Sequence, residues 1–240
     1  MAISRRDFGR SVLAGIAVTS VAGAAACGSS AGDGDLGAGG AAGAASGTGG
    51  SGGVNSCVLY PQQTAGPFYL DLDTLRRDIT EGKAGTPLQM VVRVQDESCA
   101  PLKDLAVDLW HCDASGVYSG FRGQLGGLDT SGETFLRGTQ VTGEDGVAAF
   151  ETIYPGWYPG RTTHVHFKVH MSSNTEATSQ IYFPEDTTSQ IYGTAPYDVR
   201  GQKDTSNSAD GIAVANPAPL AEVTGDSASG YVATIVVTLA

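Results

Sequence analysis

The chain has 240 residues and a formal net charge of −11, with 14 basic and 25 acidic side chains. This acidic balance argues against a protein that binds nucleic acid, and it favours solubility. The length fits one folded domain with a proper hydrophobic core.

The N-terminal region has the pattern of an export signal. Arg5 and Arg6 precede Phe8, and an apolar run of small residues extends from Ser11 to Ala26. Paired arginines before such a run are typical of the twin-arginine route, which leads to the periplasm or cell envelope. The run is too short for a convincing permanent membrane span. We therefore predict a signal peptide at residues 1–27.

The end of this signal allows two interpretations. Cys27 follows three alanines, so it is either a lipidated cysteine that forms a lipid anchor or part of a cleavage site with small residues. Lipidation is favoured because residues 28–56 are nearly all Gly, Ala and Ser, as in a tether. Such a stretch has almost nothing to bury, so we predict a flexible linker there and a folded domain at residues 57–240.

Strand signals dominate the predicted domain. Only Leu70–Arg77 has a pattern compatible with a short helix, and the last apolar run is expected to be buried on both faces. Turn-rich segments separate the runs, which predicts an all-β fold, a β-sandwich of mixed short strands with a prealbumin-like core and few short helices. The expected strands are Gln89–Val94, Leu105–Trp110, Val147–Ile153, Thr163–His170, Gln180–Phe183 and Tyr231–Leu239.

Three cysteines lie in the domain. Export permits a disulfide, and three pairings are open. We favour Cys57 with Cys99, because both lie near turn-like sequence, and interpret Cys112 as a buried free thiol.

His164 and His166 are the first candidate metal ligands. In a strand, side chains two residues apart point to the same face, about 6.6 Å apart along the strand at about 3.3 Å per residue. Two imidazoles so placed can converge on one ion. No cysteine pair, His-Glu-x-x-His helix or acidic cluster is near, so zinc is not specifically indicated. We interpret His111 and His170 as structural residues.

Tyr118 and Tyr158 are candidate donors of a second kind. A phenol has a pKa of about 10, but a strongly Lewis-acidic trivalent ion can hold it as a phenolate. Phenolate is a hard oxygen donor, unlike the thiolates that soft metals prefer. Two phenolates and two imidazoles around Fe(III) would leave one positive charge, so a catecholate dianion could replace one tyrosinate.

Five segments carry a family resemblance in their order along the chain: Thr64–Tyr69, Trp110–Tyr118, Thr152–Tyr158, Arg161–His166 and Ser179–Phe183. Together they resemble the intradiol ring-cleavage dioxygenases, with the protocatechuate 3,4-dioxygenase branch nearest, over residues 57–240. The resemblance implies a non-haem Fe(III) enzyme. Such an enzyme uses O2 to cleave a small catecholic ring between its two hydroxylated carbons, giving a cis,cis-muconate-type diacid.

The resemblance also implies which residues form the metal site. Tyr118 and His164 would be equatorial iron ligands, and Tyr158 and His166 axial ones. Tyr158 would be the ligand that the catechol displaces, and in this sense it shares the catalytic role with Arg161. That arginine would stabilise the negative charge that develops on the ring.

The remaining implied residues surround the substrate. Gln180 would place its amide behind the metal ligands, and Gly66, Pro67 and Tyr69 would line the substrate pocket. The chain departs from the family in one loop, where only residues 159–163 separate Tyr158 from His164 and Gly160 replaces an aromatic residue. We expect a more open or differently shaped pocket there.

Each of these residues also has an ordinary structural interpretation, and Trp110 is best read as a core residue. Their joint order favours the iron site. Two alternatives stay open: a non-enzymatic exported β-sandwich binding module, and a catechol or iron binder without turnover. The identity of the catechol and the oligomeric state are not specified by the sequence.

Overall fold

The computed structural model describes residues 57–172 and 174–240. The predicted signal peptide, the linker and Cys27 lie outside the described residues. The strands are β1 (Pro87–Asp96), β2 (Ala106–Trp110), β3 (Arg122–Gln124), β4 (Leu128–Asp129), β5 (Arg137–Val141), β6 (Val147–Ile153), β7 (His164–Ser172), β8 (Thr175–Tyr182), β9 (Glu222–Asp226) and β10 (Gly230–Leu239). The helices are α1 (Glu185–Tyr192), the 3-10 helix η2 (Tyr197–Val199) and α2 (Gly211–Ala215).

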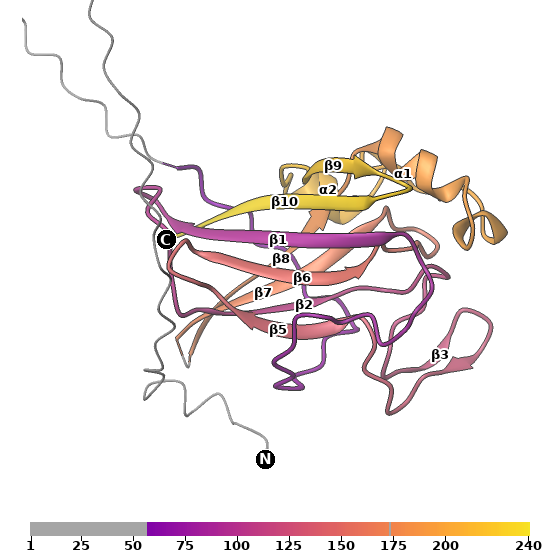
Figure 1. Ribbon diagram of the computed structural model, residues 1–240, viewed down its shortest axis with the longest axis horizontal. Coiled ribbons are helices and arrows are strands. Elements are labelled where there is room, and N and C mark those ends of the chain that lie inside the picture. The colour runs from indigo at the N-terminus through magenta and orange to yellow at the C-terminus, as the bar shows by residue number, and fades with distance from the viewer. Residues whose placement is uncertain (1–56, 173) are drawn as a thin grey trace, which may run out of the picture. The chain divides into compact units, whose positions relative to one another are not determined.

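Two four-stranded sheets form the body of the domain (Figure 1). One has the strand order β6-β1-β10-β9 and the other β5-β2-β7-β8, with β3 and β4 pairing separately. The pair β1–β10 is parallel, while the other neighbours in these sheets are antiparallel. The predicted β-sandwich of mixed strands with few short helices is confirmed.

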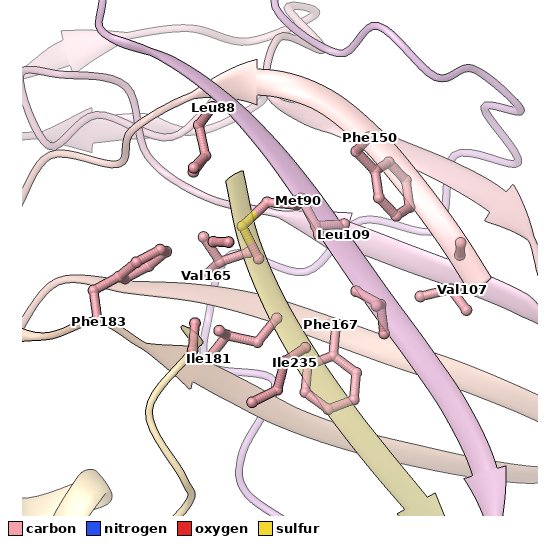
Figure 2. Packing of buried hydrophobic residues seen from close by; sticks show 14 of the residues in the cluster. Leu88, Met90, Val107, Leu109, Phe150, Val165, Phe167, Ile181, Phe183 and Ile235 are labelled. Atoms are coloured by element: carbon pink, nitrogen blue, oxygen red, sulfur yellow. The ribbon is translucent and has the colours of Figure 1, made fainter. Parts of the chain in front are cut away.

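The core lies between the inner faces of the two sheets. Strand β1 contributes Leu88, Met90, Val92 and Val94 at alternate positions, all at most 2% exposed. Figure 2 shows how such residues meet side chains from the facing sheet, including Val107, Leu109, Val165, Phe167 and Ile181. Period-two alternation places every second residue in this layer, which is the sequence pattern that predicted the strands.

The predicted strands all occur, with shifted ends in most cases and with the bounds of β6 as expected. The predicted helix at Leu70–Arg77 is wrong. The backbone N–H of Arg76 donates to the Thr139 carbonyl, and Leu75 forms a bridge to the same residue, so this segment runs beside β5 in extended form. Burial of β10 on both faces is also wrong, because Val236 is 41% exposed.

Two further features of the described part bear on the predictions. A disulfide joins Cys57 to Cys99, and Cys112 is a buried free cysteine. No helix in residues 57–172 and 174–240 has the length and apolar character needed to span a membrane.

Candidate metal centre

Strand β7 carries the two histidines on the outer face of the sheet β5-β2-β7-β8. Its other face sends Val165, Phe167 and Val169 into the core, as alternation requires. In the register of the sheet, His166 lies opposite Trp110 on β2 and opposite Gln180 on β8. Trp110, His166 and Gln180 therefore lie side by side on the outer face, and His164 is two residues before His166 on the same face.

Tyr118 reaches this face from the loop between β2 and β3. Its backbone is held on both sides, since its N–H donates to Oε1 of Gln124 at 2.7 Å and its carbonyl accepts from Nε2 of the same side chain at 2.6 Å. Thr130 donates a further hydrogen bond to that carbonyl. The Tyr118 ring stacks on Phe68 with 4.3 Å between centroids. Both its backbone and its ring are thus fixed.

Tyr158 comes from the loop between β6 and β7, which interlocks with the Tyr118 loop. Gly116 has a φ of +84°, and a Cβ on it would lie 2.1 Å from the carbonyl oxygen of Trp157. Only glycine permits this close crossing. The Trp157 indole in turn donates to the carbonyl of Gly201 at 3.0 Å, which anchors the loop from the other side.

The two phenols meet at one nitrogen of His164. The hydroxyl of Tyr158 lies 3.1 Å from Nε2, and the hydroxyl of Tyr118 lies 3.4 Å from it. The other ring nitrogen, Nδ1, lies 2.6 Å from the carbonyl oxygen of Thr162. A carbonyl can only accept, so Nδ1 carries the proton and Nε2 turns its lone pair toward the phenols.

His166 is held by stacking. Its ring lies parallel to Trp110, with 5.0 Å between centroids and 4° between planes, and 4.8 Å from the ring of His164. Its Nδ1 is buried with no hydrogen-bond partner. Gly66 lies at the edge of this ring, where a Cβ would be 3.3 Å from Cε1. The two imidazoles therefore lie next to each other, and the ring of Tyr118 lies 6.2 Å from that of His166 between centroids.

Burial keeps these donors uncharged. It lowers the pKa of His164 to about 3, with the Arg161 charge adding to the effect, and it lowers the pKa of His166 well below its usual range. Burial raises the pKa of Tyr158 to about 12 and that of Tyr118 well above its ordinary value. A cation bound among them would reverse the shift of the phenols, because it favours the phenolate form.

Arg161 borders the donor set and is held by a carboxylate. Its Nη1 lies 3.4 Å from the Tyr158 hydroxyl and 3.5 Å from Nε2 of His164. Its Nη2 donates to Oε1 of Gln180, and its Nε donates to Asp210 at 2.8 Å. Burial opposes its charge, but Tyr158 and Asp210 outweigh that effect and raise its pKa. A permanent positive charge thus lies beside the phenols.

An open cavity of about 180 Å³ reaches Tyr158 from the surface. Phe68, Leu125 and Pro159 give it an apolar lining, and Arg122 adds a positive charge. Gly160 has no atom within 4 Å of the place a Cβ would occupy, so the short loop leaves this side unobstructed. The cavity is large enough to hold a planar ring beside Tyr158.

The donor set fits a trivalent ion by its chemistry. Neighbouring donors on one ion, with bonds of about 2 Å, lie about 3 Å apart. The phenol oxygens and Nε2 of His164 have such separations, and the unpartnered nitrogen of His166 is the kind of buried polar atom that metal binding would satisfy. Among the described residues, no group of three or more His, Cys, Asp or Glu side chains is arranged to hold a metal.

The structure brings most of the predicted site residues together. Gly66 is at the edge of His166, but Pro67 is exposed, and the hydroxyl of Tyr69 donates to Asp108. Neither of the latter two lines the cavity beside Tyr158, whose wall includes Phe68 from the same segment.

The other two histidines have partners outside the donor set. His111 is buried and contacts the Cys112 carbonyl and the Thr152 hydroxyl. His170 pairs with Asp108 and Glu176.

Two residues of the site were not predicted as such. Trp110 is buried, as expected of a core residue, but it packs in the cluster with Tyr118 and orients His166. Asp210 had no role assigned. An Asp before Gly211 and Ile212 is a helix N-cap signal, and this was the only sequence feature able to draw attention to it.

The fold and the donor set define a β-sandwich with a candidate metal centre of tyrosine and histidine side chains on one outer sheet face. Comparison with known proteins extends this description. A sequence model of the Dioxygenase family matches residues 64–194, so the chain belongs to the intradiol ring-cleavage dioxygenase family.

Among curated proteins, the chain is 29% identical over 141 residues to chlorocatechol 1,2-dioxygenase of Cupriavidus pinatubonensis, covering 49% of this chain and 52% of the relative. It is 34% identical over 132 residues to the protocatechuate 3,4-dioxygenase beta chain of Burkholderia cepacia, covering 48% and 55%. The chain spans about half the length of the curated relatives it matches.

Among solved structures, an intradiol ring-cleavage dioxygenase from Tetranychus urticae is 32% identical with a TM-score of 0.71, covering 76% of this chain and 94% of that one.

Proposed function

We propose that this protein is an Fe(III)-dependent intradiol dioxygenase that cleaves a small catecholic ring with O2. The observation that carries the proposal is the convergence of both phenol oxygens on Nε2 of His164, within 3.4 Å, beside a second imidazole. Tyr118, Tyr158, His164 and His166 would hold the ion.

The chemistry that ferric iron supplies when bound is the activation of a catecholate, whose ring takes up both atoms of O2 as the bond between its hydroxylated carbons breaks. A cis,cis-muconate-type diacid accounts for all the atoms of the catechol and of O2. The protein's own residues have to bind the ring, accept its protons and stabilise its charge.

Tyr158 is suited to accept a proton from the substrate. It is the phenol at the open cavity, and burial raises its pKa to about 12. Once released from a cation, its oxygen would take a proton at neutral pH and keep it. A catechol that entered this cavity would lie against Tyr158, and a proton from its hydroxyl would have this phenol oxygen as an acceptor.

Arg161 is suited to stabilise negative charge on the ring. Its Nη1 is 3.4 Å from the Tyr158 hydroxyl, at the edge of the space that the ring would enter. A preorganised cation in a poorly solvated site stabilises developing charge without reorganisation. Gln180 holds Nη2 and in turn donates to the Thr64 carbonyl at 3.0 Å, which links the arginine to the segment around Gly66.

We also propose that residues 1–27 direct twin-arginine export to the periplasm or cell envelope, with lipidation of Cys27, and that residues 28–56 form a tether. The support is the sequence pattern described above. Mass spectrometry of the protein from a membrane fraction tests this, because a lipid on an N-terminal Cys27 is expected, and an unmodified mature N-terminus would contradict it.

The activity is tested by loading the purified protein with ferric ion and recording its visible spectrum and oxygen uptake. We expect a tyrosinate-to-Fe(III) charge-transfer band, a shift of that band on anaerobic addition of a catechol, and consumption of one O2 per catechol. Tyr158→Phe should weaken or shift the band. Tyr231→Phe, a buried tyrosine of the other sheet, is the matched control and should leave it unchanged.

The outcomes separate the alternatives. A colourless iron-loaded protein would sink the proposal and favour a non-enzymatic β-sandwich binding module. A coloured protein whose band shifts with catechols, but which consumes no O2 with any member of a catechol panel, would be a catechol binder without turnover.

A further inference from the structure

We propose that Asp210 is a positioning residue that sets both the guanidinium of Arg161 and the imidazole of His164. The inference rests on the proposed function for the role of these two side chains. Asp210 lies beyond residues 64–194, the part of the chain that matches the family model, and is reached 46 residues after His164.

The carboxylate of Asp210 uses each oxygen for a different task. Oδ1 accepts from the backbone N–H groups of Ile212 and Ala213 at 2.8 and 3.1 Å and so caps α2. Oδ2 accepts from Nε of Arg161 at 2.8 Å and from the backbone N–H of Thr162 at 2.9 Å. The residue is 0% exposed, so a buried carboxylate has all its hydrogen bonds inside the protein.

The contact with Arg161 leaves the catalytic end of that side chain free. Asp210 binds Nε, and Gln180 binds Nη2, so Nη1 is the nitrogen that faces Tyr158 and His164. A guanidinium is planar, and two fixed nitrogens determine where the third one lies. Asp210 therefore directs the positive charge toward the phenol rather than merely neutralising it.

Through Thr162, Asp210 also influences His164, a candidate metal ligand. Asp210 holds the N–H of Thr162, and the carbonyl of the same residue lies 2.6 Å from Nδ1 of His164. Partners that orient a ligand histidine in this way fix its tautomer and its direction. One carboxylate thus orients a candidate ligand on one side and a candidate catalytic cation on the other.

This arrangement compensates for the short loop between Tyr158 and His164. The loop has five intervening residues, too few to build supporting contacts of its own, and its Gly160 is open to solvent. Residues of the segment 203–210 support it instead: Lys203 and Asn207 bind the Thr162 hydroxyl, and Asp204 accepts from the N–H of Gly160. Asp210 is the fully buried carboxylate of this support.

Asp210→Asn separates the two tasks of the carboxylate. Asparagine is a favoured N-cap residue, so the cap on α2 is retained. Its NH2 group would face two donors, the Nε of Arg161 and the N–H of Thr162, so both of those contacts are lost. Asp198→Asn is the matched control, because it makes the same charge change on an exposed residue of η2.

We expect kcat of the iron-loaded Asp210→Asn protein to fall by about 10- to 100-fold, with KM for the catechol changed less than about threefold. Asp198→Asn should match the wild type. In an Arg161→Gln background, Asp210→Asn should reduce kcat by a smaller factor than in the wild type, because the effect through Arg161 is gone and only the effect through Thr162 and His164 remains. An equal fall in both backgrounds would overturn the proposal.

A measurement on the metal-free protein tests the contact between Asp210 and Arg161 independently of the activity. In the metal-free wild type labelled with ¹⁵N-arginine, the Nε–H signal of Arg161 should be protected from hydrogen exchange, and it should lose that protection in Asp210→Asn. The melting temperatures of Arg161→Gln, Asp210→Asn and the double variant should be non-additive. An unprotected Nε–H in the wild type would overturn the proposal even if Asp210→Asn fails to fold. If the wild type lacks the charge-transfer band and oxygen uptake while this signal is protected, the proposed function fails and the pairing stands.

Discussion

Replacing Gly66 by alanine tests how the segment 64–69 supports the second histidine. Gly66 has a φ of +66°, in the left-handed region that disfavours a side chain. A Cβ there would lie 3.3 Å from Cε1 and 3.7 Å from Nε2 of His166. The substitution therefore adds backbone strain and a tight contact at once, and the two effects have to be separated.

Neither the His166 ring nor the segment that carries Gly66 can move easily to relieve the tight contact. The ring of His166 is stacked on Trp110 with 4° between planes, so it can shift only within its own plane, and that shift moves its nitrogens. The segment that carries Gly66 is held at both ends, since Gln180 donates to the carbonyl of Thr64 at 3.0 Å and a buried arginine donates to that of Phe68 at 2.6 Å. Retreat of the segment would weaken these hydrogen bonds.

Gly82→Ala is the matched control for the backbone. Gly82 has a φ of +73° and no atom within 4 Å of a Cβ, so alanine there meets strain alone, about 1–2 kcal/mol. Gly66→Ala should lose a further amount of about 1 kcal/mol, the usual cost of a side chain pushed from its preferred position. A displaced ligand should also weaken ferric binding by about tenfold, an effect expected of Gly66→Ala only.

Urea unfolding of the metal-free variants measures the first difference, and titration with ferric ion at the charge-transfer band measures the second. If both alanine variants lose the same free energy of unfolding and bind iron as the wild type does, segment 64–69 does not support His166. The reasoning from the close approach at Gly66 would then be refuted.

Three further predictions concern stability, each measured by urea unfolding. Arg137→Met should lower the free energy of unfolding by about 2–4 kcal/mol, because this arginine is 3% exposed and binds two backbone carbonyls. Arg122→Met on the surface should change the free energy of unfolding by less than about 0.5 kcal/mol. Replacing Cys57 and Cys99 by serine should cost up to about 4 kcal/mol, the entropy of closing a loop with a sequence separation of 42. Burial lowers the pKa of His111 to about 4, below the unfolded value of about 6.5, so the unfolded chain binds more protons, and in the metal-free protein His111 alone should account for a loss of up to about 3 kcal/mol in the free energy of unfolding as the pH falls from about 6.5 to 4. His111→Gln should reduce that slope by about one proton, and an unchanged slope would contradict the assignment.

Alternation in the sequence predicted the strand that carries the histidines, because successive residues of a half-buried strand point in turn to the core and to the other face. The apolar set Val165, Phe167 and Val169 required one face to enter the core, and this left His164 and His166 together on the other. The helix predicted at Leu70–Arg77 had no comparable constraint. Its local pattern was overridden by hydrogen bonds to β5, which only the folded chain supplies.

Asp210 shows the limit of the same reasoning. Its N-cap role is local and is visible in the residues that follow it. Its second carboxylate oxygen accepts from Arg161 only because the segment after η2 folds back against the sheet. No periodic pattern in the sequence predicts that the chain folds back there. Trp110 differs again, since burial was expected of it, but contact with His166 follows from the pairing of β2 with β7.

Because the candidate centre lies on an outer sheet face, one part of the protein holds the donor side chains and other parts cover them. The core fixes β7 from the inner side, while two segments distant in sequence cover the outer side: one passes through Gln63 and Gly66, and the other ends at α2. They meet where Nε2 of Gln63 donates to the carbonyl of Asn216 at 2.6 Å. Gln180 binds the Thr64 carbonyl of the first segment and also Arg161, which in turn donates to Asp210 of the second. Changes in the covering segments can therefore alter the pocket and the arginine while the strand that carries the histidines keeps its register.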